Sequence, residues 1–204
     1  MHGTTLDKHS ARRSSGNNDA TRSAKGTGII AGIAFVKKRG GPQGYERFLQ
    51  RLTQQERTIL EGLITPMMQF DEALLQHMVH AIVDEFLDGN PERSAELGRF
   101  IIEDGLSSMY RMFRKMGDPT KTIAGAGRIW QLYHSVGSLQ VYDLEPKSAR
   151  IRLTYPYLDL PFCRMTAGMF IASLEQSSAQ TVRIAHEKCV AKGDRYCQYH
   201  LTWK

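Results

Sequence analysis

The spacing of hydrophobic residues changes near residue 138, and this change limits the folds open to the chain. Before that point, the apolar residues between Phe70 and Leu87 recur every three or four positions. This spacing places them on one face of a helix. We expect Asp88 and Gly89 to end that helix, and Asn90 to begin another that runs to about Lys115. A further helix is expected over residues 120–135.

After residue 138 apolar and polar residues alternate, which is the rhythm of half-buried strands. The alternation covers residues 139–144 and 149–155. Residues 160–176 return to helical spacing, and two more strands, 181–190 and 196–203, flank a turn at Lys192–Asp194. The sequence therefore predicts an α+β fold, with an N-terminal helical layer packed on an antiparallel strand–strand–helix–hairpin half.

Residues 1–27 differ in composition from the rest of the chain. They are rich in Ser, Thr, Asn, Gly, Arg and Lys and carry a net charge of +3, half of the +6 of the whole chain. Such a segment has too few apolar residues to offset the entropy of ordering, so we expect a disordered basic tail. Residues 28–204 are expected to form a single ligand-binding-like domain. The remaining charge is not gathered into a basic run with stacking aromatics, so nucleic acid is not the expected partner.

No segment predicts insertion into or export across a membrane. The longest apolar stretch, Ile29–Val36, is far shorter than the roughly 20 residues that a spanning helix needs. The first 27 residues show no secretory signal. The three cysteines are an odd number and indicate no disulfide framework, so we expect a cytoplasmic protein that is not bound to a membrane.

The cysteines predict a metal site near the C-terminus. Cys189 and Cys197 are equidistant from Gly193 in the predicted hairpin, so they face each other across its two strands. Cys163, at the start of the helix over residues 160–176, is the expected remote ligand. His186 is the expected fourth ligand, with Glu187 as the alternative if the strand faces the other way. On spacing alone, buried thiols that simply fill the core are the favoured interpretation.

The end of the chain resembles a known family. Residues 186–203 read HEKCVAKGDRYCQYHLTW, which is similar to the end of the 4-vinyl-reductase-type small-molecule-binding domain. That family belongs to the superfamily of haem nitric-oxide sensors and vesicle-tethering subunits. The chain as a whole also resembles a bacterial paralogous family of similar length in the same superfamily. Its aromatic-sensing regulators carry zinc. The resemblance implies a structural zinc site at Cys163, His186, Cys189 and Cys197, although His186 stands where the regulators have Glu.

Haem and catalysis are less well supported. Haem sensors bind the propionates through a Tyr-x-Ser-x-Arg motif, and here Tyr110 and Arg114 are correctly spaced, but Met112 replaces the Ser. His77 and His80 are expected to be ordinary helix-surface histidines. The sequence contains no nucleophile elbow, P-loop or dinucleotide fingerprint, so we expect no enzyme.

We therefore expect a non-catalytic sensory or regulatory domain that binds a small apolar or aromatic molecule. It would form a homodimer and signal to a partner protein. The alternative is a scaffold or adaptor that uses the same fold for protein–protein contacts. The residues expected to line a ligand pocket are Met109, Phe113, Trp130, Tyr133, Met165 and Phe170.

Overall fold

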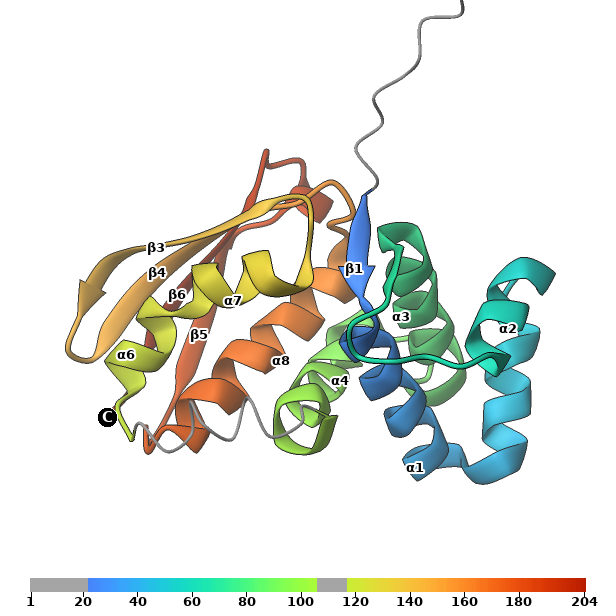
Figure 1. Ribbon diagram of the computed structural model, residues 1–204. Coiled ribbons are helices and arrows are strands. Elements are labelled where there is room, and N and C mark those ends of the chain that lie inside the picture. The colour runs from blue at the N-terminus through green and yellow to red at the C-terminus, as the bar shows by residue number, and fades with distance from the viewer. Residues whose placement is uncertain (1–21, 106–116) are drawn as a thin grey trace, which may run out of the picture.

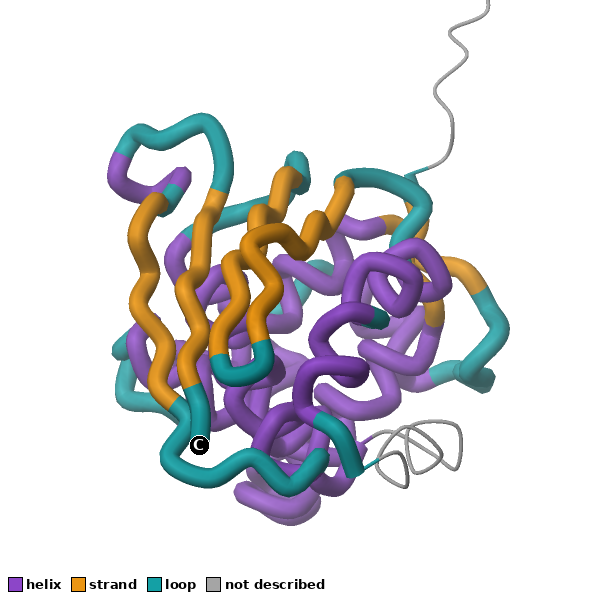
Figure 2. The backbone as a smooth tube through the Cα atoms, turned by 90° about the vertical axis from the view of Figure 1, so that its left-hand side faces the viewer, coloured by secondary structure: helices purple, strands orange, loops and turns teal. Residues whose placement is uncertain are grey.

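The computed structural model describes residues 22–105 and 117–204, and it confirms the predicted α+β fold. A four-stranded antiparallel sheet and three helices form one half of the molecule, and the N-terminal helices form the other (Figure 1). The tube in Figure 2 shows the helices on one side of this sheet. The helices of the N-terminal half are α1 (Gly26–Gln50), α2 (Gln54–Glu61), α3 (Glu72–Phe86) and α4 (Ser94–Phe100).

A short two-stranded sheet begins the described chain. Strand β1 (Ser23–Lys25) pairs with β2 (Gln69–Asp71), and β1 leads directly into α1. Residues 1–21 of the predicted tail lie outside the described residues, but Ser23–Lys25 were expected in that tail and instead form a strand. Ala24 is 2% exposed and the amide of Ser23 donates to Ser135 Oγ at 2.7 Å. Burial and pairing thus order this segment despite its polar composition.

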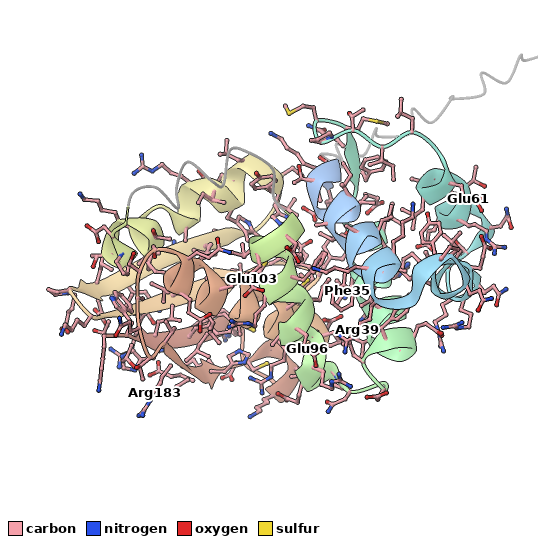
Figure 3. All side chains as sticks on the ribbon, turned by 90° about the horizontal axis from the view of Figure 1, so that it is seen from below. Phe35, Arg39, Glu61, Glu96, Glu103 and Arg183 are labelled. Atoms are coloured by element: carbon pink, nitrogen blue, oxygen red, sulfur yellow. The ribbon has the colours of Figure 1, made fainter. Side chains whose placement is uncertain are left out.

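The N-terminal helices follow local sequence signals. Thr53 and Glu56 form a capping box at the start of α2, since each side chain bonds the other residue's backbone amide. The Gly-Gly-Pro sequence at residues 40–42 disfavours a continuous helix, and α1 is kinked there, with Gly41 at a φ of 59°. The Arg39 guanidinium of α1 lies 2.7 Å from the Glu96 carboxylate of α4 and joins the two helices (Figure 3).

The prediction of a single long helix from Asn90 to Lys115 is wrong over the residues that the structure describes. Asn90 does cap the segment, because its side chain accepts from the amide of Glu92. The chain then passes through a 3₁₀ turn (Pro91–Arg93), α4 and a π-helical turn (Ile101–Gly105). A Cβ atom at Gly98 would lie 1.9 Å from the Met165 carbonyl oxygen, so the backbones of α4 and α8 are in close contact. The pattern of apolar residues in the sequence does not reveal this contact.

The helix predicted over residues 120–135 is divided in two. Helices α6 (Pro119–Ala124) and α7 (Ala126–Tyr133) meet at Gly125. A Cβ atom at Gly127 would lie 2.5 Å from the Leu139 carbonyl oxygen, so this glycine lets α7 lie close to the first strand of the large sheet. Asp118 caps α6 by accepting from the amides of Thr120 and Lys121.

The large sheet has the strand order β3-β4-β6-β5 and matches the predicted C-terminal half. Its strands are β3 (Ser138–Glu145), β4 (Ser148–Thr154), β5 (Arg183–Lys188) and β6 (Cys197–Thr202). Alternate residues of β4 and β6 are buried, and helix α8 (Leu160–Gln176) covers this face. Asp159 caps α8 by accepting from the amide of Phe162 at 2.9 Å. No helix within the described ranges is long and apolar enough to cross a membrane.

Candidate ligand cavity and thiol cluster

Helix α8 positions both groups of residues that could carry function. Cys163 lies on the side of α8 that faces β6, where the Tyr199 hydroxyl donates to the Cys163 carbonyl at 3.0 Å. Met165, Thr166 and Met169 of the same helix line a cavity beneath α6 and α7. One helix therefore separates a cluster of thiols from an apolar space.

The thiol cluster brings together the four residues predicted as metal ligands. The three sulfur atoms and a ring nitrogen of His186 all lie within 4.8 Å of one another. Cys163 and Cys197 are fully buried, with their sulfur atoms 2.7 Å apart, and Cys189 is 2% exposed. Lys188 pairs with Gln198 in the β5–β6 ladder, so the turn brings Cys189 opposite Cys197 as the spacing predicts.

His186 faces the cluster and Glu187 does not. The ring of His186 stacks on Tyr199 with centroids 4.5 Å apart, and its Nε2 is buried without a hydrogen-bond partner among the described residues. The Glu187 carboxylate accepts from Gln198 Nε2 at 2.6 Å and from Arg150 Nε at 3.3 Å, on the outer side of the sheet. Glu187 as the alternative fourth ligand is therefore wrong, since neighbouring strand residues point to opposite faces.

The cluster is electrostatically asymmetric. The hydrogen bond from Cys163 lowers the pKa of Cys197 to about 4, and the same contact, together with burial, raises the pKa of Cys163. Burial is also the main cause that raises the pKa of Cys189. Cys197 is therefore the sulfur that loses its proton most readily, and Cys163 donates a hydrogen bond to it. Such a separation of pKa values is expected for thiols in close contact.

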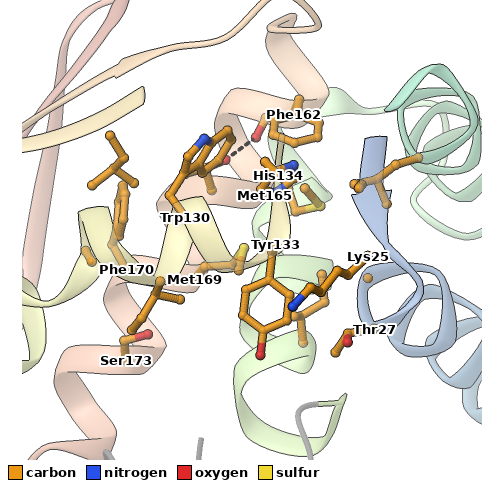
Figure 4. A pocket seen from close by; sticks show the side chains of 18 of the residues that line it. Lys25, Thr27, Trp130, Tyr133, His134, Phe162, Met165, Met169, Phe170 and Ser173 are labelled. Carbon is orange, nitrogen blue, oxygen red and sulfur yellow. Dashed lines mark hydrogen bonds between the residues drawn. The ribbon is translucent and has the colours of Figure 1, made fainter. Parts of the chain in front are cut away.

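The cavity has a volume of about 130 Å³ and is lined mainly by apolar side chains (Figure 4). Its size is comparable with the roughly 150 Å³ of an engineered apolar cavity that admits benzene. Among the residues predicted for a pocket, Trp130, Tyr133, Met165 and Phe170 line it, whereas Met109 and Phe113 lie outside the described residues. Sequence reasoning missed the contributions of β1, α1 and α3, which come from Ala24, Lys25, Thr27, Gly28 and Leu75.

A buried polar cluster lies beside one end of the cavity. The Glu72 side chain is 0% exposed, and its carboxylate contacts the Tyr155 hydroxyl at 2.5 Å and His134 Nδ1 at 3.0 Å. The His134 ring is one of the cavity walls and stacks on Trp130 with centroids 4.0 Å apart. In the sequence, Glu72 resembles an ordinary acidic residue in the first turn of a helix, so no local signal marks it.

The other histidines considered as ligands are occupied elsewhere. His77 and His80 lie on α3 with about half of each side chain exposed. Their ring nitrogens bond Glu56 at 2.5 Å and Asp159 at 2.6 Å, respectively. Both are surface residues, as expected, while Tyr110, Met112 and Arg114 lie outside the described residues.

Comparison with solved structures identifies the architecture. An H-NOX protein from S. oneidensis in the Fe(II)NO state superposes with a TM-score of 0.70 and 16% identity, covering 88% of this chain and 99% of that chain. The fold is that of H-NOX proteins. Fe(II) unliganded H-NOX from K. algicida gives a TM-score of 0.65 at 10% identity, covering 88% of this chain and 96% of that one. No protein-family model matches this chain, and no curated protein matches it.

The comparison corrects the cofactor prediction. The solved structures that share the fold are described with iron in the Fe(II) state, and one is described as a study of heme distortion in H-NOX proteins. Zinc as the cofactor of a domain with this fold is therefore contradicted. The resemblance that implied zinc covered residues 95–204 and was specific only over residues 186–203, whereas the H-NOX match extends over 88% of the chain.

Proposed function

We propose that this chain is a non-catalytic sensory domain that binds a small, mostly apolar molecule in the cavity between α7, α8 and α1. The observation that carries the proposal is the cavity itself, an apolar space with a few polar groups at its edge. Enclosed apolar spaces with convergent polar groups are the usual form of a small-molecule site. The shared H-NOX fold supports a sensory role. We place the domain at residues 23–204 instead of the predicted 28–204, because β1 pairs with β2 and Ala24, Lys25 and Thr27 line the cavity. We propose that the domain acts as a homodimer and through a partner protein.

The cavity does not fit haem, the group named for the structural neighbours. Its volume of about 130 Å³ is below the roughly 300–1,000 Å³ of sites for larger ligands. Lys25 is the one Lys or Arg among the described lining residues, whereas haem carries two propionates. His134 is the single histidine among the lining residues that the structure describes, and α6 and α7 contain none. We therefore derive no function through haem, and expect no stoichiometric Soret shift when haemin is added to the purified protein.

A titration with toluene tests the proposal. Toluene is similar in size to the benzene that an engineered cavity of comparable volume accepts. We expect saturable 1:1 binding by ligand-detected NMR, and loss of binding in Ala126→Phe, which places a ring in the cavity from α7. The matched control is Ala185→Phe on the exposed side of β5, which should bind as the unmodified protein does. Equal loss in both variants, or no binding to the unmodified protein, contradicts the proposal.

The adaptor alternative is not favoured. It requires a filled core and a broad exposed apolar face, because such a face is what a partner protein would cover. Among the described residues, the exposed large apolar side chains are divided between the loop before β2 (Leu63, Met67 and Met68), α7 (Leu132) and β3 (Leu144). An adaptor that acts only through its surface needs no internal cavity, so the cavity favours ligand binding.

We also propose that Cys163, His186, Cys189 and Cys197 bind a metal ion, without assigning the element. The support is the convergence of three sulfurs and one ring nitrogen of His186, together with a buried His186 Nε2 that has no hydrogen-bond partner among the described residues. Thiolate and imidazole together suit soft and borderline transition metals. Elemental analysis of protein purified without chelators or a histidine tag should show about one metal ion per chain, and a metal-free protein would leave the cysteines as core residues.

A further inference from the structure

We propose that His134 Nε2 is the recognition atom of the cavity and selects ligands that carry one N–H or O–H donor. The inference rests on the proposed function and adds the chemical class of the ligand. It starts from the polar cluster of Glu72, His134 and Tyr155, which neither the thiol cluster nor the apolar walls explain.

The protons in this cluster follow from its contacts. Burial and the contact with Glu72 raise the pKa of the Tyr155 hydroxyl far above its usual range, so this hydroxyl is a donor. An ionised carboxylate accepts hydrogen bonds and donates none. Glu72 accepts from the Tyr155 hydroxyl, and we assign the single ring proton of His134 to Nδ1, the nitrogen that lies 3.0 Å from the same carboxylate.

That proton leaves Nε2 with a free lone pair. In a neutral imidazole one nitrogen donates and the other accepts. A carboxylate that contacts Nδ1 makes Nδ1 the donor and Nε2 the acceptor. Within the described ranges no group bonds Nε2, although the ring itself lines the cavity. A ligand with a donor satisfies this acceptor, whereas a ligand without one leaves it unpaired in an apolar space.

The ring is held firmly enough to discriminate between ligands. Trp130 stacks on one side of it, and Tyr155 meets its edge with centroids 5.5 Å apart. The backbone is also fixed, because His134 forms a bridge with Ala24 and the amide of Ser135 donates to the Ser23 carbonyl at 2.9 Å. A preorganised acceptor loses little entropy on binding, so the hydrogen bond contributes to selectivity.

Two isomers test the inference. The probes 2-methylpyrrole and 1-methylpyrrole have the same atoms, but only 2-methylpyrrole has an N–H, and that group is a donor without an acceptor lone pair. We expect 2-methylpyrrole to bind about tenfold more tightly, as one hydrogen bond in a dry site provides. His134→Phe should reduce the ratio to about one. The matched control His77→Phe, at a half-exposed histidine of α3 outside the cavity, should keep it.

A measurement on the unmodified protein keeps the test independent of how well the variant folds. In ¹⁵N spectra of the histidine rings, the Nε2 resonance of His134 should shift with 2-methylpyrrole and stay in place with 1-methylpyrrole. Equal affinities for the two isomers while toluene still binds would overturn the inference and leave the proposed function standing. Failure of toluene to bind would instead overturn the proposed function.

Discussion

The two sides of α8 present different chemistry on the same rigid element. Towards the sheet, Cys163 meets polar and ionisable partners from β5 and β6 that lie within a few ångströms of it. Towards α7, Met165 and Met169 face an apolar space. The side towards the sheet is built from cysteines and a histidine, which can be recognised as possible metal ligands in the sequence. The side towards α7 is built from ordinary apolar residues around a cavity. Sequence reasoning is therefore strong for the thiol cluster and weak for the cavity.

Phe162→Ala, which alters the wall of the cavity, is expected to cause the largest loss of stability. Phe162 is 2% exposed and packs on Tyr155 with centroids 5.0 Å apart. Truncating a buried Phe lowers the free energy of unfolding by about 3–5 kcal/mol, which chemical denaturation would measure. Metal content should be unchanged if the two sides are independent, and loss of metal would show that they are coupled.

Gly168→Ala should disturb both sides at once, because it displaces α8 itself. A Cβ atom at this position would lie 2.1 Å from the Ala95 carbonyl oxygen of α4. Overpacking of this kind lowers the free energy of unfolding by about 1–3 kcal/mol. We expect a loss at the upper end of this range because the backbone atoms in contact cannot move away by changing rotamer. Toluene affinity and metal content should both decline. A variant with unchanged stability would contradict the close contact between α4 and α8.

Cys189→Ser isolates the thiol side. If the cluster holds a metal, we expect metal content to fall below half and the free energy of unfolding to fall by about 2 kcal/mol, since such a site contributes directly to folding. Toluene binding should remain. The control is Glu187→Gln on the outer side of the sheet, which should retain the metal. Loss of metal from the control alone would reverse the assignment of ligands.

Thr53→Ala should have the smallest effect and should reach neither side of α8. It removes one half of the capping box of α2 and should lower the free energy of unfolding by about 1 kcal/mol. Both metal content and toluene affinity should stay as they are. A change in either would mean that α2 influences α8, contrary to the separation that the fold shows.

The sequence alone determined the features that depend on near neighbours. The capping box at Thr53, the bounds of α8 and the alternation in β4 and β6 follow from propensity and periodicity, which act over a few residues. The four members of the thiol cluster were also predicted, because hairpin geometry brings Cys189 opposite Cys197 and the preceding helix, which carries Cys163, was expected to pack there.

Only the tertiary structure decided the features that depend on distant contacts. The close packing of α4 on α8 depends on the approach of Gly98 to Met165, which is 67 residues away in the sequence. The cluster of Glu72, His134 and Tyr155 joins α3, the end of α7 and the end of β4. The cavity is volume left between elements, and volume depends on how whole helices pack, which residue spacing does not encode.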